Sequence, residues 1–297
     1  DENIIFTPFL RYFLISQVGT SQMYSMIAGS ALTRLTVEKI NWIRAPIPPI
    51  SEQKKIVMWV DKIENTFKPS IELLERQLKS LEEKRSALIV QAITKGLDLD
   101  VPMMESVIDS IGEIPSHWEE IRLKNLIRRV SRPVVVDTDQ SYREIGIRSW
   151  GTGIFHKEPI KGNLLGDKKV FNIKPGDLVL NIVFAWEGAV ALVSGDEEGM
   201  IASHRFPTFR CNQDLVLLDY ILLFLQSKHG RAIMGFNSPG AAGRNRTIRI
   251  GSFLDEVIPL PPLEEQRRIL NSVRRTESLG HQLQSLISQL IKKVREY

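Results

Sequence analysis

The chain has 297 residues, of which 43% are hydrophobic and 25% charged, and this ordinary globular composition excludes disordered and collagen-like classes. It carries a formal net charge of +4 and one cysteine, Cys211, which excludes a disulfide scaffold and favours a reducing cytoplasm. No apolar run reaches the roughly 20 residues of a membrane span and no signal-peptide pattern opens the chain, so we expect no membrane contact.

A proline-rich box begins at Pro46, near the end of residues 1–50, and occurs twice in the chain. Pro46-Ile-Pro-Pro-Ile-Ser-Glu-Gln-Lys-Lys-Ile56 returns 213 positions later as Pro259-Leu-Pro-Pro-Leu-Glu-Glu-Gln-Arg-Arg-Ile269, with six identities in eleven positions. Upstream of the box the repeat continues at a spacing of 211, where Phe9, Phe13, Leu14, Ser16, Gly19 and Met23 match Tyr220, Phe224, Leu225, Ser227, Gly230 and Met234. Self-similarity over such a long period indicates duplication of a whole structural unit.

Each copy of the box leads into a helical pattern, and the first predicts a helix over residues 51–95. Apolar side chains recur at alternating steps of three and four, the rhythm of a coiled coil, and only Glu64 and Arg85 interrupt the stripe. Gly96 is the predicted stop, while Pro69 is a candidate kink inside the helix. Three leucines of the stripe are expected to be core residues: Leu74, Leu78 and Leu81.

Residues 96–111 are the expected linker to an intact globular domain over residues 112–262. Four of its segments have strand-like composition between Gly-, Asn- and Asp-bearing turns: residues 142–148, 177–184, 189–193 and 247–253. Two others have a helical pattern: residues 219–226 and 227–234. Residues 263–297 predict a second long helix, which Gly280 weakens in its middle.

We therefore predict a mixed α/β fold. It consists of a globular domain with a twisted mixed β-sheet and flanking helices, plus two long antiparallel helices that form a coiled coil. Two such helices bury their apolar stripes against each other, and some 30 residues at ~1.5 Å each would hold the parts at their ends ~45 Å apart. The helix pair is therefore expected to act as a spacer.

A catalytic site has no candidate residues in this sequence. The chain contains no Gly-Lys dipeptide, which excludes a Walker phosphate loop, and its histidines lack metal-ligand spacing. It also lacks an Asn/Asp-Pro-Pro-aromatic motif for methylation of a base amino group, and an acidic pattern typical of nucleases. We therefore expect no catalytic residue, no cofactor and no metal site, and an enzyme is the weaker hypothesis.

The duplicated box, opening a long helix each time, resembles the specificity (S) subunit of type I restriction-modification systems. Gly112-Glu-Ile-Pro-Ser-His-Trp118 is similar to the usual opening of a target-recognition domain in that family. The resemblance implies two such domains, each reading half of a split site in double-stranded DNA, held apart by two antiparallel helices. It also implies methyltransferase (M) subunits docked on the helices, restriction (R) subunits as indirect partners, and catalysis in these partners. A non-catalytic DNA sequence-recognition subunit is the expected function.

Within that resemblance, residues 1–50 are the C-terminal remnant of a first target-recognition domain. Residues 51–95 and 263–297 are the two conserved spacer helices, and residues 112–262 are the intact second domain. We therefore expect the chain to bind one half of a bipartite DNA site. Three explanations stay open for the other half: it is encoded elsewhere, it is lost to proteolysis, or a second copy replaces it in a homodimer.

Candidate DNA contacts lie in a stretch without Asp or Glu, residues 220–254, and in two earlier segments. Arginine forks to guanine O6 and N7, asparagine pairs with adenine, and lysines on phosphates set the register. In the acid-free stretch the candidates occupy a glycine-rich loop and are Arg244, Asn245 and Arg246. In the earlier segments they are Arg143, Arg148, Ser149, Trp150, Lys157, Lys161, His204 and Arg205.

Each of these residues also has a structural explanation. A glycine-rich loop is often a solvated turn, a tryptophan is more often a packing residue than a contact, and exposed lysines often serve solubility. Four residues of the two boxes are expected to be structural, as helix caps: Glu52, Gln53, Glu265 and Gln266. The alternative function is a coiled-coil assembly or adaptor protein that binds a protein partner without DNA specificity.

Overall fold

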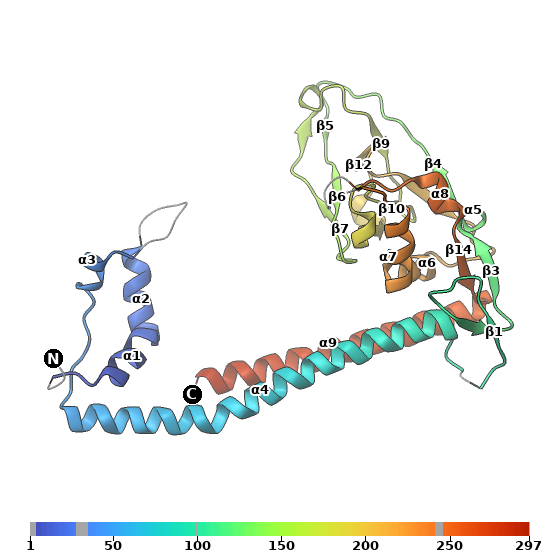
Figure 1. Cartoon of the computed structure of the whole chain (residues 1–297). Coiled ribbons are helices and arrows are strands. Elements are labelled where there is room, and N and C mark those ends of the chain that lie inside the picture. Colours follow the sequence, from blue (N-terminus) through green and yellow to red (C-terminus); the bar gives the residue numbers. More distant parts are fainter. Residues whose placement is uncertain (1–3, 28–34, 99, 241–245, 297) are drawn as a thin grey trace. The chain divides into compact units, whose positions relative to one another are not determined.

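The computed structural model describes residues 4–27, 35–98, 100–240 and 246–296, and the chain divides into two compact units (Figure 1). Unit 1 comprises residues 1–80 and 284–297, and unit 2 comprises residues 81–283. Two long helices contribute residues to both units: α4 (Ile50–Lys95) and α9 (Leu263–Glu296). No helix within the described ranges is both long and apolar enough to cross a membrane.

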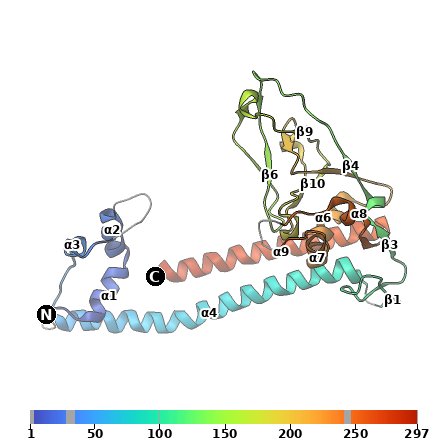
Figure 2. The same ribbon diagram turned by 45° about the horizontal axis from the view of Figure 1, so that its top comes forward.

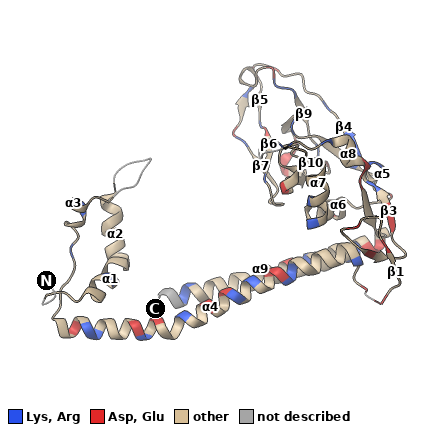
Figure 3. Ribbon diagram, viewed as in Figure 1, with Lys and Arg blue, Asp and Glu red and all other residues tan. Residues whose placement is uncertain are grey.

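The two long helices confirm the pattern of box and heptads. α4 starts one residue before its predicted range and continues through Pro69, while α9 starts at the predicted Leu263. α4 ends at Lys95, directly before the predicted stop Gly96, whose φ of +76° lies in the left-handed region that glycine adopts without penalty. Lys and Arg are interspersed with Asp and Glu along both helices (Figure 3), as solvated helix faces require.

Unit 1 contains three short helices together with the N-terminal part of α4: α1 (Thr7–Ile15), α2 (Gln17–Met26) and α3 (Val37–Ile40). Phe9 and Phe13 of α1 are buried. The Tyr12 hydroxyl donates to Asp61 Oδ1 at 2.6 Å and to Glu64 Oε2 at 3.1 Å. The hydrogen bond to Asp61, together with burial and Glu64, raises the pKa of Tyr12 to about 12. Glu64, which interrupts the apolar stripe of α4, therefore binds Tyr12 of α1.

Unit 2 contains all the strands found among the described residues, and these are short and antiparallel within each sheet. The central sheet has four strands in the order β11-β10-β13-β4: β11 (Val190–Leu192), β10 (Leu178–Leu180), β13 (Thr208–Cys211) and β4 (Ile127–Val130). Five strand pairs complete the described set: β1 (Met103–Glu105) with β2 (Glu113–Pro115), β3 (Glu119–Arg122) with β14 (Val257–Leu260), β5 (Ser141–Tyr142) with β8 (Ile160–Lys161), β6 (Ile145–Ile147) with β7 (Ile154–His156), and β9 (Val170–Asn172) with β12 (Ile201–Ser203). β1 lies inside the segment expected to be a linker.

The main core of unit 2 lies between the central sheet and the helices of this unit. In both views α6 (Leu218–Gln226) and α7 (Lys228–Phe236) lie between the strands and the C-terminal end of α4 (Figures 1 and 2). Tyr220 is fully buried, and its hydroxyl donates to the carbonyl oxygen of Ile93 in α4 at 3.4 Å. Burial raises the pKa of the Tyr220 phenol, so this group stays a neutral donor.

The upstream repeat appears as two pairs of equivalent helices. α1 and α2 of unit 1 correspond to α6 and α7 of unit 2, and Ser16 and Ser227 cap α2 and α7 by accepting from the backbone N–H groups of Gly19 and Gly230. A Cβ atom on either glycine would overlap backbone oxygen of the preceding helix. The sharp turn between the two helices therefore requires glycine in both copies.

α4 and α9 pack in antiparallel orientation within unit 2. Near one end, a Cβ atom on Gly96 would lie 2.9 Å from Glu265 Oε1, and farther along, one on Gly280 would lie 3.4 Å from Arg85 Cδ. Arg85, the second interruption of the apolar stripe, therefore lies over Gly280, the residue that interrupts the partner helix. Because glycine has no side chain, Gly280 leaves room for Arg85, and α4 and α9 can pack closely at this point.

Two expectations about local structure are wrong. Residues 247–253 do not form a strand, because α8 (Ile250–Asp255) packs on α5 (Leu123–Leu126) and buries Phe253 completely. Leu81 is not a core residue, since 41% of it is exposed, and Leu74 and Leu78 are only half-buried. A helix with one helical partner covers one side only, so part of a wide apolar stripe stays in solvent.

Candidate nucleic-acid interface

The β6–β7 hairpin presents an exposed tryptophan at its turn. The turn begins with Arg148, whose backbone N–H donates to the carbonyl oxygen of Gly153 at 3.0 Å. Trp150 has a φ of 62°, and it is the one residue other than glycine with a positive φ in the described ranges. A bulky residue in the left-handed region is strained, and yet 67% of Trp150 is exposed rather than packed in the core. The hairpin therefore holds an indole ring in solvent at an energetic cost.

Contacts from a neighbouring 3-10 helix, η2 (Ala185–Glu187), keep this turn in place. The carbonyl oxygen of Glu187 accepts from the Trp150 backbone N–H at 2.8 Å, and its carboxylate accepts from the Ser149 hydroxyl. The Arg231 guanidinium of α7 lies 5.6 Å from the centre of the Trp150 ring, in the range of a cation–π contact. Arg231 is itself fixed, since it donates to the carbonyl oxygen of Gln226 at 2.7 Å.

The far strand of the hairpin is fastened by a buried carboxylate. His156 Nε2 in β7 lies 2.8 Å from Glu197 Oε1. Burial raises the pKa of Glu197, but the hydrogen bonds from His156 and Ser194 outweigh burial and lower it below its usual value. Glu197 is therefore an anion that binds both β7 and its own loop, so the hairpin is anchored at both ends.

One side of the hairpin borders a cavity of about 360 Å³, which we call the aromatic cavity. Its lining comprises three half-buried phenylalanines and six further residues: Phe155, Phe184, Phe206, Gly146, Ile147, Arg148, Ser149, Lys157 and Asn181. Gly146 faces Phe155 across the β6–β7 register, and a Cβ atom on Gly146 would lie 2.2 Å from that ring. The Phe155 ring therefore lies flat on the backbone of β6.

Predicted contact residues form a basic rim around the aromatic cavity. The Arg148 guanidinium lies 5.2 Å from the centre of the Phe155 ring. Lys157 Nζ lies 3.5 Å from the buried carboxylate of Glu144, and Arg143 Nε donates to the carbonyl oxygen of Lys157 at 3.2 Å. Four predicted residues, Arg143, Arg148, Ser149 and Lys157, are thus brought together at one site.

The remaining described candidates lie on neighbouring segments. Lys161 is exposed in β8, opposite Ser141 of β5. His204 and Arg205 are exposed between β12 and β13, directly before Phe206 of the aromatic cavity. Lys161 and Arg205 thus add exposed positive side chains on segments outside the hairpin.

The candidate loop of the acid-free stretch is only partly described. Arg244 and Asn245 lie outside the described residues. Arg246 Nε donates to the carbonyl oxygen of Ser238 at 3.1 Å, and its guanidinium lies 5.1 Å from the centre of the Trp186 ring. Arg246 thus already uses Nε in a bond to Ser238, while its base contact stays a prediction.

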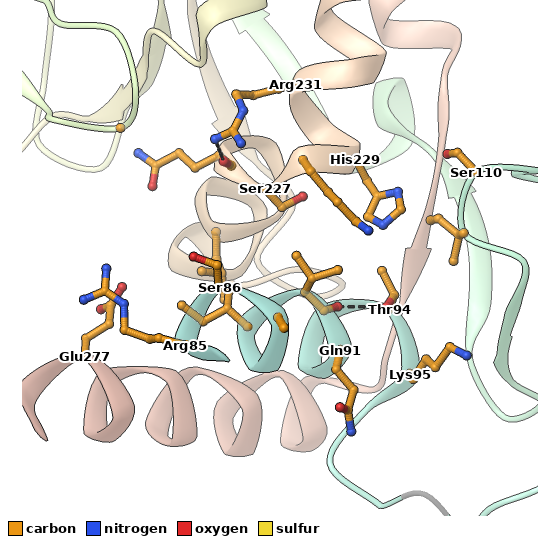
Figure 4. A pocket seen from close by; sticks show the side chains of 18 of the residues that line it. Arg85, Ser86, Gln91, Thr94, Lys95, Ser110, Ser227, His229, Arg231 and Glu277 are labelled. Carbon is orange, nitrogen blue, oxygen red and sulfur yellow. Dashed lines mark hydrogen bonds between the residues drawn. The ribbon is translucent and has the colours of Figure 1, made fainter. Parts of the chain in front are cut away.

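A second cavity of about 1030 Å³ lies between the C-terminal end of α4 and the start of α7 (Figure 4). Basic side chains from both helices line it, among them Arg85, Lys95, Lys228 and Arg231, against two acids, Glu113 and Glu277. Trp150 borders this cavity as well. The turn of the hairpin therefore separates the larger basic cavity from the aromatic one.

Sequence reasoning missed the residues that hold and line this site. Glu187 and Arg231 support Trp150 from positions far along the chain, and no local motif marks them. The three phenylalanines are likewise dispersed in sequence and meet only in the fold. Asn181 lay inside a predicted strand segment, but nothing local singled it out. The glycines around Trp150 were the one available signal, because Gly151 and Gly153 both have positive φ.

No three His, Cys, Asp or Glu side chains gather closely enough to hold a metal ion among the residues the structure describes. The single thiol, Cys211, is half-buried in β13. Burial raises its pKa to about 12 despite the nearby charge of Arg210. The residues of the hairpin and its two cavities offer stacking, hydrogen bonding and positive charge.

Known proteins share this sequence pattern and fold. The family model of the type I restriction modification DNA specificity domain matches residues 1–83 and 115–292. The specificity subunit of the type I restriction enzyme MjaVIII from Methanocaldococcus jannaschii is 22% identical over 290 residues, which cover 91% of this chain and 64% of that subunit. The EcoBI specificity subunit of Escherichia coli is 22% identical over 84% of this chain and 54% of its own length. The chain thus spans a little under two thirds of the curated relatives it matches.

A solved structure supports the fold. This structure comes from work on the structural basis of complex assembly and conformational transition of the type I R-M system. It aligns with 100% of this chain and 70% of its own, with a TM-score of 0.66 and 17% identity. At this identity the likeness concerns the arrangement of helices and strands alone.

Proposed function

The chain belongs to the family of type I restriction-modification DNA specificity domains, and from this premise we propose that unit 2 binds duplex DNA through the β6–β7 hairpin. The observation that carries the proposal is the rigid, exposed Trp150 beside a basic rim and an aromatic cavity. Positive side chains bind phosphates without regard to sequence, whereas aromatic rings and hydrogen-bond donors contact bases. The hairpin combines both kinds of group.

The division of labour along the chain follows from this proposal. Residues 112–262 act as an intact target-recognition domain, and residues 1–50 as the C-terminal part of another. Residues 51–95 and 263–297 act as the conserved spacer helices. One complete reader binds one half of a bipartite site, so a second reader is needed for the other half.

The chain itself carries out no catalysis in this proposal. Methyltransferase subunits dock on the spacer helices and modify the DNA that unit 2 selects, and restriction subunits join through them. The exposed apolar side chains of the spacers support such docking, among them Leu88 of α4 and Leu279 of α9. The complex acts in the cytoplasm, where the DNA is.

The same exposed leucines favour one alternative function. A coiled-coil adaptor would use α4 and α9 to bind a protein partner and would show no preference among DNA sequences. Association through apolar stripes persists at high ionic strength, whereas DNA binding weakens steeply. Salt therefore separates the two functions.

The test is selection from a random-sequence duplex pool with the full chain, alone and together with a type I methyltransferase subunit. We expect enrichment of one short motif and a dissociation constant that rises about tenfold or more between 50 and 200 mM salt. A control chain with Lys124→Ala, which lies in α5 away from the hairpin, should select the same motif. Absence of any enriched motif, with undiminished protein association at high salt, would favour the adaptor.

A further inference from the structure

The aromatic cavity combines apolar walls with one unused amide donor. Asn181 is 9% exposed, and its Oδ1 accepts from the backbone N–H of Val183 at 3.0 Å. Within the described residues no hydrogen bond engages its Nδ2, although Asn181 lines the cavity. Among the described residues, Nδ2 is not one of the fully buried side-chain atoms that lack a partner, so this donor is open to solvent where Asn181 lines the cavity. An occupant with an acceptor atom can therefore replace water at this donor.

The walls are preformed and suited to a flat ring. Phe184 and Phe206 pack on a core cluster that includes Val179 and Ala189, while Phe155 lies flat on Gly146. The volume of about 360 Å³ falls in the range of roughly 300–1,000 Å³ found for small-molecule sites. Phenylalanine rings bind planar aromatic groups by stacking, without regard to sequence.

The surroundings of the cavity carry features that a nucleic acid requires. Arg148 and Lys157 supply positive charge at the mouth, where the phosphates of an approaching strand would lie. Trp150, next along the turn from Ser149, is exposed and held rigidly by Glu187 and Arg231. A rigid exposed ring is suited to fill the gap that a displaced base leaves in the stack.

We propose that the aromatic cavity receives one nucleobase turned out of the DNA duplex, with Asn181 Nδ2 donating to a carbonyl oxygen of that base. The inference rests on the proposed DNA binding by unit 2. Thymine, cytosine and guanine carry such an oxygen and adenine does not, so the occupant is one of the first three. No bond is made or broken, and the duplex closes again on release.

A mismatch scan tests this directly. A base that is already unpaired costs less to turn out, so a single mismatch at the extruded position strengthens binding. Duplexes carrying the selected motif and one mismatch at each position in turn are titrated with the full chain. We expect an affinity gain of about tenfold at one position and none or a loss at the others.

Two variants assign the gain to the cavity. Phe184→Leu removes one stacking wall, and Asn181→Asp keeps the acceptor for Val183 while it removes the free donor. Both should reduce the mismatch gain to less than about twofold. Phe236→Leu is the matched control, because Phe236 is 84% exposed at the end of α7, outside the cavity, and should keep the full gain. Circular dichroism of each variant verifies folding, and Asn181→Asp carries the test if Phe184→Leu does not fold.

Each of the following results would overturn the extruded base. Motif-specific binding without a favoured mismatch position overturns the extruded base and leaves DNA recognition by unit 2 intact. An undiminished gain in both cavity variants places the base elsewhere and also overturns it. If the cavity variants lose binding of the methyltransferase subunit but keep the mismatch gain, the cavity holds a protein side chain instead of a base. Absence of any motif-specific binding overturns the proposed function together with the inference.

Discussion

Gln53 and Gln266, equivalent residues of the two proline-rich boxes, are both fully buried and make the same set of three hydrogen bonds. In unit 1, Gln53 Oε1 accepts from the backbone N–H of Phe6 at 2.7 Å. Its Nε2 donates to the carbonyl oxygens of Ile4 at 3.0 Å and Pro48 at 2.7 Å. One side chain thus joins the start of α1 to the box itself.

Gln266 repeats this arrangement in unit 2. Its Oε1 accepts from the N–H of Leu217 at 2.8 Å, and its Nε2 donates to the carbonyl oxygens of Leu215 at 2.9 Å and Pro261 at 2.8 Å. The expectation that these glutamines are structural is confirmed, although only one partner of each lies just before its helix and the other two lie in another segment. The box is a joint between the segment before α6 and the helix that follows.

Loss of this joint should destabilise unit 2. Gln266→Leu removes the partner of the buried Pro261 carbonyl group and of two partly buried groups, the Leu217 N–H and the Leu215 carbonyl, and a buried group without a partner costs about 1–3 kcal/mol. We expect the free energy of unfolding in urea to fall by about 3 kcal/mol. The control is Glu264→Gln, since the side chain of Glu264 is 79% exposed, and its change should stay within about 0.5 kcal/mol. A similar fall in the free energy of unfolding in both variants would contradict the structural role of Gln266.

Two glycines of unit 2 should respond to alanine in opposite directions. A Cβ atom on Gly230 would lie 2.3 Å from the backbone oxygen of Phe224, so Gly230→Ala should cost about 3 kcal/mol. On Gly280 the nearest atom, Arg85 Cδ, would lie at 3.4 Å, an ordinary contact. Gly280→Ala should therefore stabilise the helix by about 0.5–1 kcal/mol. Urea unfolding followed by circular dichroism measures both, and a destabilised Gly280→Ala would refute the packing described for α9.

Trp150 should be dispensable for folding and needed for DNA. Trp150→Gly removes the backbone strain at a φ of 62° but also the contact with Arg231, so stability should change by less than about 1 kcal/mol. Affinity for the selected duplex should fall about tenfold, since stacking on an aromatic ring contributes about 1–3 kcal/mol per base. Unchanged affinity would leave the exposed indole without a role in binding.

The stability of unit 2 should fall on mild acidification through His229. Burial, and to a smaller extent the charge of Lys228, lowers the pKa of His229 below its ordinary value of 6.5. The unfolded chain therefore binds a proton at higher pH than the folded chain does. The stability that neutral His229 contributes is fully present above about pH 6.5 and is lost as the pH falls through the lower pKa of His229 in the folded chain. Unfolding free energies at pH 8 to 5 should fall less steeply in His229→Gln, and parallel curves would contradict this.

The long helices were predictable because their signals are local and repeated. The proline-rich box and the heptad stripe that follows it predict the starts of α4 and α9 to within one residue. The strand predicted over residues 247–253 failed for the opposite reason. Its β-branched residues favour a strand locally, but burial of Phe253 against α5 is better met by a helix, so tertiary packing overrode propensity.

The site was predictable only where charge and glycine marked it. Arg143, Arg148, Ser149 and Lys157 were singled out separately, and the fold brings them together around the aromatic cavity. The cavity itself had no sequence signal, because its phenylalanines meet across three segments. Contacts between distant segments set both the support of Trp150 and the free amide of Asn181.

The most direct measurement of DNA recognition by the hairpin is the dissociation constant of the selected duplex for Arg148→Ala across a salt series. We predict an increase of about tenfold or more and a salt slope shallower by about one. Arg267→Ala, on the exposed face of α9, should change the constant less than about twofold. An unchanged dissociation constant and an unchanged slope for Arg148→Ala would contradict the claim that this hairpin binds DNA.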